Sequence, residues 1–252
     1  IRRPPRSTLS SSSAASDVYK RQAQRILDHK SNFPLWIIAN EQTSGRGRKN
    51  RYWVSQKGNF MGTFILEHEI EKQYIPHLSF VTSLALKKTI EDFNSGVRDI
   101  FLKWPNDIII NDSKCAGILI ESLRSNNSKE YLAIGIGVNL IKYPLNSSFK
   151  ATSLKEEFNF DVDRDEFLTK LNINLLENIK RWEKGKNFSQ ILKDWKKFAY
   201  KINESISMLL PTGKKIQGIF SDLNDQGGLI LSHNKETSVF YAAEIIEELK
   251  IV

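Results

Sequence analysis

Residues 45–53 read Gly-Arg-Gly-Arg-Lys-Asn-Arg-Tyr-Trp, which places four positive charges, two glycines and a tryptophan in one short stretch. Glycine lets the backbone approach a ligand closely and adopt conformations that a Cβ forbids. Arginine side chains match the geometry of phosphate and carboxylate oxygens, and an indole offers a flat face to a base. The stretch therefore indicates either a site for a small anionic ligand or a solvated basic loop.

The distribution of charge favours a small anionic ligand. The chain has 252 residues and a formal net charge of +8, of which residues 1–22 carry +4 and residues 45–53 carry +4. The rest of the chain is therefore neutral. A neutral body with one basic loop does not suit an extended nucleic-acid surface, which needs a basic stripe or patch.

Composition is that of an ordinary soluble protein. No apolar run approaches the roughly 20 residues of a membrane span, and the longest apolar stretches, such as Ile108–Ile110, are strand-sized. The single cysteine, Cys115, excludes an internal disulfide. Without a signal peptide, we expect a reducing cytoplasmic location and no membrane association.

Hydrophobic periodicity predicts an α+β fold with a mixed, largely antiparallel sheet and packed helices. Ile26 and Leu27 indicate the end of a short helix, and residues 141–163 have the composition of a loop. Helices are expected at Pro76–Asn94, Asp165–Trp182 and Phe188–Phe198. Strands are expected at Leu35–Ala39, Asn59–Leu66, Ile100–Lys103, Asp107–Ile110, Ala116–Glu121, Tyr131–Asn139, Ser205–Leu210, Lys214–Asp222, Gly228–Ser232 and Ser238–Tyr241.

Changes in composition and in the length of the predicted elements divide the chain into three parts. Residues 1–22, rich in serine and proline with almost nothing to bury, are expected to be a disordered or artefactual tail. Residues 23–203 are expected to form the main domain. The short strands and tight turns of residues 204–252 predict a small β-barrel.

Two further motifs stand at strand ends. Lys103-Trp104-Pro105-Asn106-Asp107 interrupts the predicted strands, because Pro105 cannot donate to a strand ladder. Asn106 and Asp107 then stand where binding groups are common, although Asn-Asp also forms ordinary turns. Gly135 and Gly137 interrupt an apolar strand, which indicates either a bulge or the close approach of a ligand or of another backbone.

These motifs together resemble the biotin protein ligases, that is, the biotin–[acetyl-CoA-carboxylase] ligases. The resemblance rests on order and spacing and covers roughly residues 23–252. It is carried by Gly45-Arg46-Gly47-Arg48, Trp53, Ser55, Gly58, Asn59, Lys103–Asp107, Lys114–Leu119 and Gly135-Ile136-Gly137-Val138-Asn139.

The resemblance implies the biotin/lipoate ligase catalytic fold followed by an SH3-like barrel, and a two-step reaction. Biotin and ATP, with Mg²⁺, give biotinyl-5′-AMP and pyrophosphate. The biotinyl group is then transferred to a lysine of a biotin carboxyl carrier domain of acetyl-CoA carboxylase. A homodimer is left open.

The resemblance also assigns roles to individual residues. Lys114, Arg48 and Asp107 are expected to be catalytic, with Asp107 orienting the incoming lysine or a metal; no metal ligand is otherwise assigned. The residues expected to bind biotin or biotinyl-5′-AMP are Gln42, Gly45, Arg46, Gly47, Arg48, Lys114, Gly117, Gly135 and Gly137. The residues expected to bind ATP or adenine are Trp53, Lys103, Asn106 and Asn139.

The chain departs from the family pattern in three places. Asn50 stands where the family usually has glycine, and Cys115 with Ala116 is interpreted as core. The family's Ser-Thr-Asn segment, which contacts biotin, would fall at Lys20 inside the tail, so the catalytic domain is expected to be truncated at its N-terminal side. The helix-turn-helix domain of repressor-type members is not found, so no DNA binding is expected.

Two other functions stay open at this point. A lipoate or octanoate ligase or transferase shares the catalytic fold, and Cys115 beside Lys114 would be its candidate thiol. A non-catalytic nucleic-acid-binding module would use the basic loop alone, with affinity that falls as salt is added.

Overall fold

The computed structural model describes residues 33–48, 52–67, 70–94, 96, 99–124, 130–145, 149–233 and 236–246. The predicted tail, the helix end at Ile26 and Leu27 and residue Asn50 lie outside the described residues. In the part of the chain that is described, no helix is long and apolar enough to cross a membrane.

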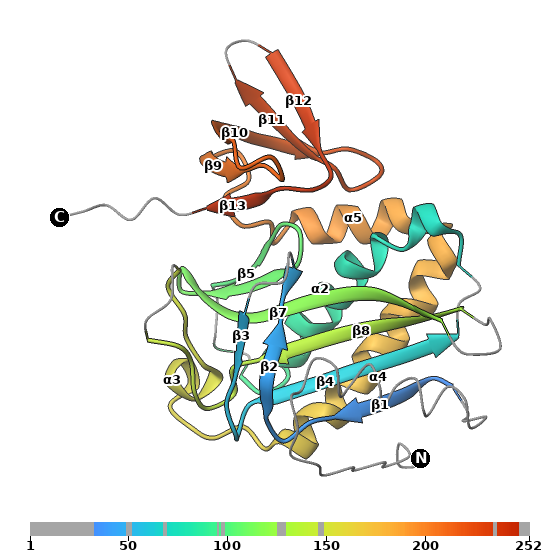
Figure 1. The fold of residues 1–252 in the computed structure, drawn as a ribbon, viewed down its shortest axis with the longest axis vertical. Helices are drawn as coiled ribbons and strands as arrows, with labels where there is room; N and C mark the ends of the chain where they lie inside the picture. The colour runs from blue at the N-terminus through green and yellow to red at the C-terminus, as the bar shows by residue number, and fades with distance from the viewer. Residues whose placement is uncertain are drawn as a thin grey trace.

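Figure 1 shows a large β-sheet with helices packed behind it and a smaller β-sheet formed by the C-terminal strands; a third, two-stranded sheet is described below. The helices are η2 (Lys72–Tyr74), α2 (His77–Glu91), α3 (Leu154–Phe158), α4 (Arg164–Trp182), η3 (Glu183–Gly185) and α5 (Phe188–Lys196). The strands are β1 (Leu35–Ile38), β2 (Gln42–Arg46), β3 (Tyr52–Ser55), β4 (Phe60–Glu67), β5 (Ile100–Lys103), β6 (Asp107–Ile110), β7 (Ser113–Arg124), β8 (Glu130–Val138), β9 (Ser205–Leu209), β10 (Lys215–Leu223), β11 (Leu229–His233), β12 (Glu236–Phe240) and β13 (Glu244–Ile246).

The large sheet has six strands in the order β1-β4-β8-β7-β6-β5, and all its neighbouring pairs are antiparallel. In β8, Ile134, Ile136 and Val138 are buried in the core that the sheet shares with the helices. Gly135 and Gly137 alternate with them and so face the other side of the sheet. This alternation leaves the second face open for a binding site.

The helices follow from local sequence. α2 is buried nearly all round, as expected for a helix between a sheet and other helices. α4 begins after Asp163, whose side chain accepts a hydrogen bond from Glu166 N at 2.8 Å, and it presents Phe167, Leu171 and Leu175 to the core. The predicted α+β fold and its three predicted helices, α2, α4 and the shorter α5, are confirmed.

The structure corrects the predicted basic loop. Residues 42–46 and 52–55 form a two-stranded antiparallel sheet, β2 and β3, in which Gly45 lies opposite Trp53. The sequence Gln-Thr-Ser-Gly-Arg lacks the apolar alternation that signals a strand, which is why only a loop was predicted. The hairpin crosses the open face of the large sheet (Figure 1).

Four short elements were also missing from the prediction: η2, η3, α3 and β13. The last two help to shape the site. Within the predicted loop at residues 141–163, Ser153 caps the helix α3 by accepting a hydrogen bond from Glu156 N at 3.2 Å. The strand β13 pairs with β9 after the last predicted strand. Both elements are too short for their periodicity to be read from sequence.

The C-terminal strands form a five-stranded antiparallel sheet in the order β12-β11-β10-β9-β13, consistent with an SH3-like unit. No pairing between β12 and β13 closes this sheet into a ring within residues 205–233 and 236–246. Its apolar residues belong to the same core as those of the large sheet. Trp104 Nε1 donates a hydrogen bond to Gly227 O at 3.0 Å across the seam, so the two sheets are packed together. The division at residues 203 and 204 stays a prediction.

Candidate functional site

A cavity of about 760 Å³ lies between the open face of the large sheet, the β2–β3 hairpin and the C-terminal strands. Each residue that the sequence analysis proposed for the site lines this one cavity. They are Gln42, Gly45, Arg46, Gly47, Arg48, Trp53, Lys103, Asn106, Asp107, Lys114, Gly117, Gly135, Gly137 and Asn139.

Two glycines that face each other across β7 and β8 form the floor beneath Trp53. Gly117 pairs with Gly137, and a Cβ added to Gly137 would lie 2.7 Å from Trp53 Nε1. A Cβ added to Gly117 would lie 3.2 Å from Trp53 Cζ3. A side chain at either position would keep the indole from approaching the sheet this closely. Both glycines lie in regular strand pairing rather than at a bulge.

Lys114 and Asp107 form the charged centre of the cavity. Lys114 Nζ lies 2.7 Å from Asp107 Oδ2, with both side chains less than one-fifth exposed. The same ammonium lies 5.4 Å from the centroid of the Trp53 ring and 5.2 Å from that of Phe149. A cation is therefore held beside aromatic surface, where a carboxylate or phosphate could meet it.

The turn between β5 and β6 places Asp107 at the beginning of a strand. Asn106 Nδ2 donates to Ile118 O at 2.5 Å, and Asn106 N donates to Lys103 O at 3.1 Å. The turn is thus fixed to the neighbouring strand β7. Lys103 and Asn106 consequently line the cavity on the same side as Asp107.

Asn139 follows β8 and is only 3% exposed. Its Nδ2 donates to Thr152 O at 3.0 Å, and its backbone N donates to Cys115 O at 2.9 Å. The first bond joins the end of β8 to the segment before α3, and the second joins it to β7. The amide is therefore held in one orientation at the cavity wall.

The polar residues of the β2–β3 hairpin are held in place by a side-chain hydrogen bond and by the close pairing of its two strands. Ser55 Oγ donates to Gln42 Oε1 at 2.7 Å, and a Cβ on Gly45 would lie 2.5 Å from Trp53 O. Gly45 is therefore required by the close pairing of the two strands. The exposed Arg46 and the partly buried Arg48 follow it along the rim.

Cys115 is buried and does not line the cavity. Burial raises the pKa of its thiol above the ordinary value, with a smaller contribution from the nearby Glu157. A nucleophilic thiol needs a thiolate, which this surrounding disfavours. The interpretation of Cys115 as core is confirmed, and an acyl-thioester mechanism through it is disfavoured.

Sequence reasoning missed several polar or aromatic residues of the cavity wall, and four of them come from outside the large sheet and the hairpin. Phe149 and Lys150 come from the segment before α3, and Lys215 and Glu244 come from the C-terminal strands. None of them stands in a motif. Only the packing of the small sheet against the large one brings Lys215 and Glu244 to the site.

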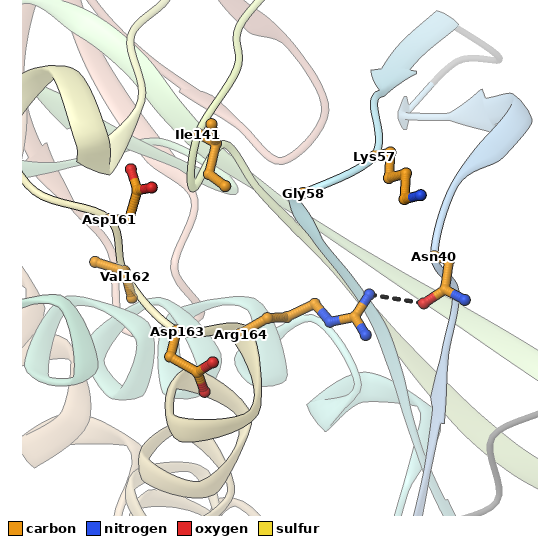
Figure 2. A pocket seen from close by; sticks show the side chains of 8 residues that line it. All are labelled: Asn40, Lys57, Gly58, Ile141, Asp161, Val162, Asp163 and Arg164. Atoms are coloured by element: carbon orange, nitrogen blue, oxygen red, sulfur yellow. Dashed lines mark hydrogen bonds between the residues drawn. The ribbon is translucent and has the colours of Figure 1, made fainter.

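A second, more open hollow of about 540 Å³ lies where the hairpin joins the body (Figure 2). Asn40 precedes β2 and accepts a hydrogen bond from Arg164 Nη1 at 2.8 Å, while Gly58 follows β3. The Asp163 carboxylate caps α4 through Glu166 N. The hydrogen bond between Arg164 and Asn40 thus fixes the start of the hairpin to the N-terminal end of α4 at this hollow. The hollow is lined by Asn40, Lys57, Gly58, Ile141, Asp161, Val162, Asp163 and Arg164.

Two family models match the chain. Residues 17–139 match the biotin/lipoate A/B protein ligase family, and residues 201–246 match the biotin protein ligase C-terminal domain. The two matches cover the hairpin, the large sheet and the C-terminal strands.

Individual relatives agree with these matches. The chain is 34% identical over 218 residues to a biotin–[acetyl-CoA-carboxylase] ligase of Paracoccus denitrificans, covering 83% of this chain and 89% of the relative. It is 31% identical to the bifunctional ligase/repressor BirA of Bacillus subtilis, covering 90% of this chain and 70% of that one. Among solved structures, a biotin protein ligase from Aquifex aeolicus in complex with biotin and ATP superposes with a TM-score of 0.75 and 27% identity, covering 88% and 91% of the two chains.

Proposed function

The chain belongs to the biotin protein ligases of the biotin/lipoate A/B protein ligase family, and from this we propose a role for each wall of its cavity. It is a ligase that uses ATP to activate biotin as biotinyl-5′-AMP. The relatives named above are ligases of biotin rather than of lipoate or octanoate. The observation that carries the assignment of the site is the convergence on one cavity of every residue that the sequence analysis proposed for it.

In the first step, a biotin carboxylate oxygen bonds to the α-phosphorus of ATP, and the bond to pyrophosphate breaks. Two anions must approach each other, so cations placed where the charges meet lower the barrier. Lys114 has three N–H donors. It can therefore keep Asp107 as a partner and still contact the carboxylate and the phosphate. Arg46 and Arg48 at the rim bind the remaining phosphate oxygens.

The adenine would be held by Trp53 and Asn139. Trp53 lies over the glycine floor of β7 and β8, and Asn139 is fixed at the cavity wall by Thr152. An aromatic face and a fixed amide are the groups that recognise a base by stacking and by hydrogen bonding. Gln42, at the far end of the hairpin, would line the biotin end of the cavity.

The residues present fit Mg²⁺ delivered with ATP. In nucleotide sites Mg²⁺ is held by one or two carboxylates together with the phosphates, and Asp107 and Glu244 both line the cavity. No group of three or more acidic, histidine or cysteine side chains among the described residues could hold a metal by itself. When bound, Mg²⁺ would neutralise phosphate charge, and Asp107 is the residue proposed to hold it.

In the second step, the amine of a carrier lysine attacks the carbonyl carbon of the mixed anhydride, an amide forms and AMP leaves. We assign the orientation of this amine to Asp107, whose Oδ1 is buried without a hydrogen-bond partner in the described part of the chain. The acceptor is proposed to be a biotin carboxyl carrier domain of acetyl-CoA carboxylase.

The experiment compares Lys114→Ala with Lys142→Ala, an exposed lysine outside the cavity. Biotin-dependent release of pyrophosphate should fall roughly 100-fold or more in the first variant, the scale of an electrostatic group lost from a transition state. It should stay at the parental rate in the second. An unchanged rate in folded Lys114→Ala would remove Lys114 from the mechanism, and release driven by lipoate or octanoate would reassign the substrate.

A further inference from the structure

The backbone of Lys114 is hydrogen-bonded to a segment that does not belong to the large sheet. Lys114 N donates to Lys150 O at 2.9 Å, and Thr152 N donates to Lys114 O at 3.0 Å, so residues 150–152 run parallel beside the start of β7. Lys150 also lines the cavity. The position of this segment therefore sets the position from which the Lys114 side chain extends.

One carboxylate fastens this segment to the body. Glu157 Oε1 accepts a hydrogen bond from Thr152 Oγ1 at 2.5 Å, and Glu157 Oε2 accepts one from Asn111 Nδ2 in the turn between β6 and β7. Thr152 is only 4% exposed. Glu157 thus bridges this segment and the turn that leads into β7.

The same segment also holds the proposed adenine side of the site. Thr152 O accepts the hydrogen bond from Asn139 Nδ2. Thr152 is therefore bonded to Lys114, to Asn139 and to Glu157 at once. Loosening Thr152 would disturb the proposed catalytic lysine and the proposed adenine contact together.

We propose that Glu157 is a positioning residue for the adenylation step, acting through Thr152 on Lys114 and Asn139. The proposal rests on the role assigned to Lys114 above. A lysine side chain has many rotamers, so its aim depends on a fixed backbone. A misplacement of about 1 Å in a reacting group can cost on the order of 100-fold in rate. Glu157 itself does not line the cavity.

The test measures single-turnover adenylation in Glu157→Ala, with Glu156→Ala as the matched control. Glu156 is the adjacent residue of α3 and is exposed, so its replacement removes the same charge from the same turn. The rate constant of adenylation should fall about 10-fold in Glu157→Ala, a fraction of the loss for direct misplacement, while the KM for biotin stays within about twofold. Glu156→Ala should match the parent.

Two further variants separate positioning from general destabilisation. Glu157→Gln keeps both bonds if the Asn111 amide turns over, so it should restore the rate. Thr152→Val removes the hydroxyl donor at nearly constant shape, and combining it with Glu157→Ala should cost no more than either change alone. A parental rate in Glu157→Ala, or additive losses in the double variant, would overturn the proposal.

Lys114→Ala, measured in parallel, keeps the two ideas distinct. If it loses adenylation while folded Glu157→Ala does not, the positioning role is wrong and the proposed function stands. If Lys114→Ala itself adenylates at the parental rate, the assigned mechanism fails, and the positioning role fails with it because it has no lysine to act through.

Discussion

Replacing Gly137 with alanine should displace Trp53 from its place over the sheet. The added Cβ would lie 2.7 Å from both Nε1 and Cε2 of Trp53 and 2.9 Å from Cζ2. Non-bonded carbon atoms pack at about 3.5–4.0 Å. The indole therefore has to move by about 1 Å, because β8 is paired on both sides and cannot yield easily.

The size of the effect follows from that displacement. A 1 Å misplacement of a positioning group costs on the order of 100-fold in rate, which is about 2.7 kcal/mol at about 1.36 kcal/mol per tenfold change. Trp53 is proposed to cover the adenine, so the loss should appear in biotin-dependent pyrophosphate release and in the KM for ATP. The assay is a titration of ATP at saturating biotin.

Two comparisons make this result interpretable. Gly135→Ala, two residues earlier, would meet Leu119 only at the ordinary distances of 3.5 and 3.7 Å, so its melting temperature shows what the substitution alone does to β8. In a Trp53→Ala background the Gly137→Ala methyl should have little further effect. A parental rate in Gly137→Ala, or an equal loss in both backgrounds, would refute the argument that the methyl acts through Trp53.

The remaining predictions concern retention of the intermediate, pH, the thiol and the seam between the sheets. Arg48→Gly should still form biotinyl-AMP but release it, which is checked by biotinylation of a bystander protein that lacks a carrier domain; no labelling above the parent would show that Arg48 does not retain the intermediate. Burial lowers the pKa of His77 from 6.5 to about 4, so its contribution to stability is fully present above pH 6.5 and is lost as the pH falls towards 4. We expect the unfolding free energy to drop by roughly 1–2 kcal/mol from pH 8 to pH 5 after allowing for solvent screening. This drop should be absent in His77→Phe. Cys115→Ala should keep adenylation, with an unfolding free energy lower by about 1 kcal/mol, and inactivation would contradict its interpretation as core. Gly227→Ala, at a φ of +78° with Phe80 atoms 2.7 Å from the added Cβ, should cost roughly 1–3 kcal/mol in urea unfolding; an unchanged midpoint would show that the seam adapts.

Elements with strong periodicity or clear capping were predictable from sequence. The N-cap Asp163 and the apolar stripe from Phe167 to Trp182 define α4, and the confirmed helix begins one residue before the predicted range. The apolar run at Tyr131–Asn139 likewise matches β8, which spans Glu130–Val138. In α4 and in β8 the secondary structure that the local sequence favours is also the one that buries the apolar residues, so local and tertiary interactions favour the same structure.

The hairpin was not predictable in the same way. Its strands are held by pairing with each other and by contact with glycines that come much later in the chain. Neither interaction leaves an alternating apolar pattern in residues 42–55. The motif residues of the site were found because their chemistry is concentrated in short stretches. Phe149, Lys150, Lys215 and Glu244 were missed because each is a single residue with no local signature.

The seam between the two sheets also bears on how freely the C-terminal unit can be exchanged between relatives. Trp104, in the turn between β5 and β6, donates a hydrogen bond to the backbone oxygen of Gly227. Phe80 of α2 fills the space that a side chain at position 227 would take. A chimaera joined at residue 203 would keep these two aromatic residues but replace the turn that receives them. Recombination within this family should therefore yield folded chimaeras when the inherited blocks include both faces of the seam, and misfolded ones when the crossover separates them; a library of crossovers scored for soluble yield would measure this.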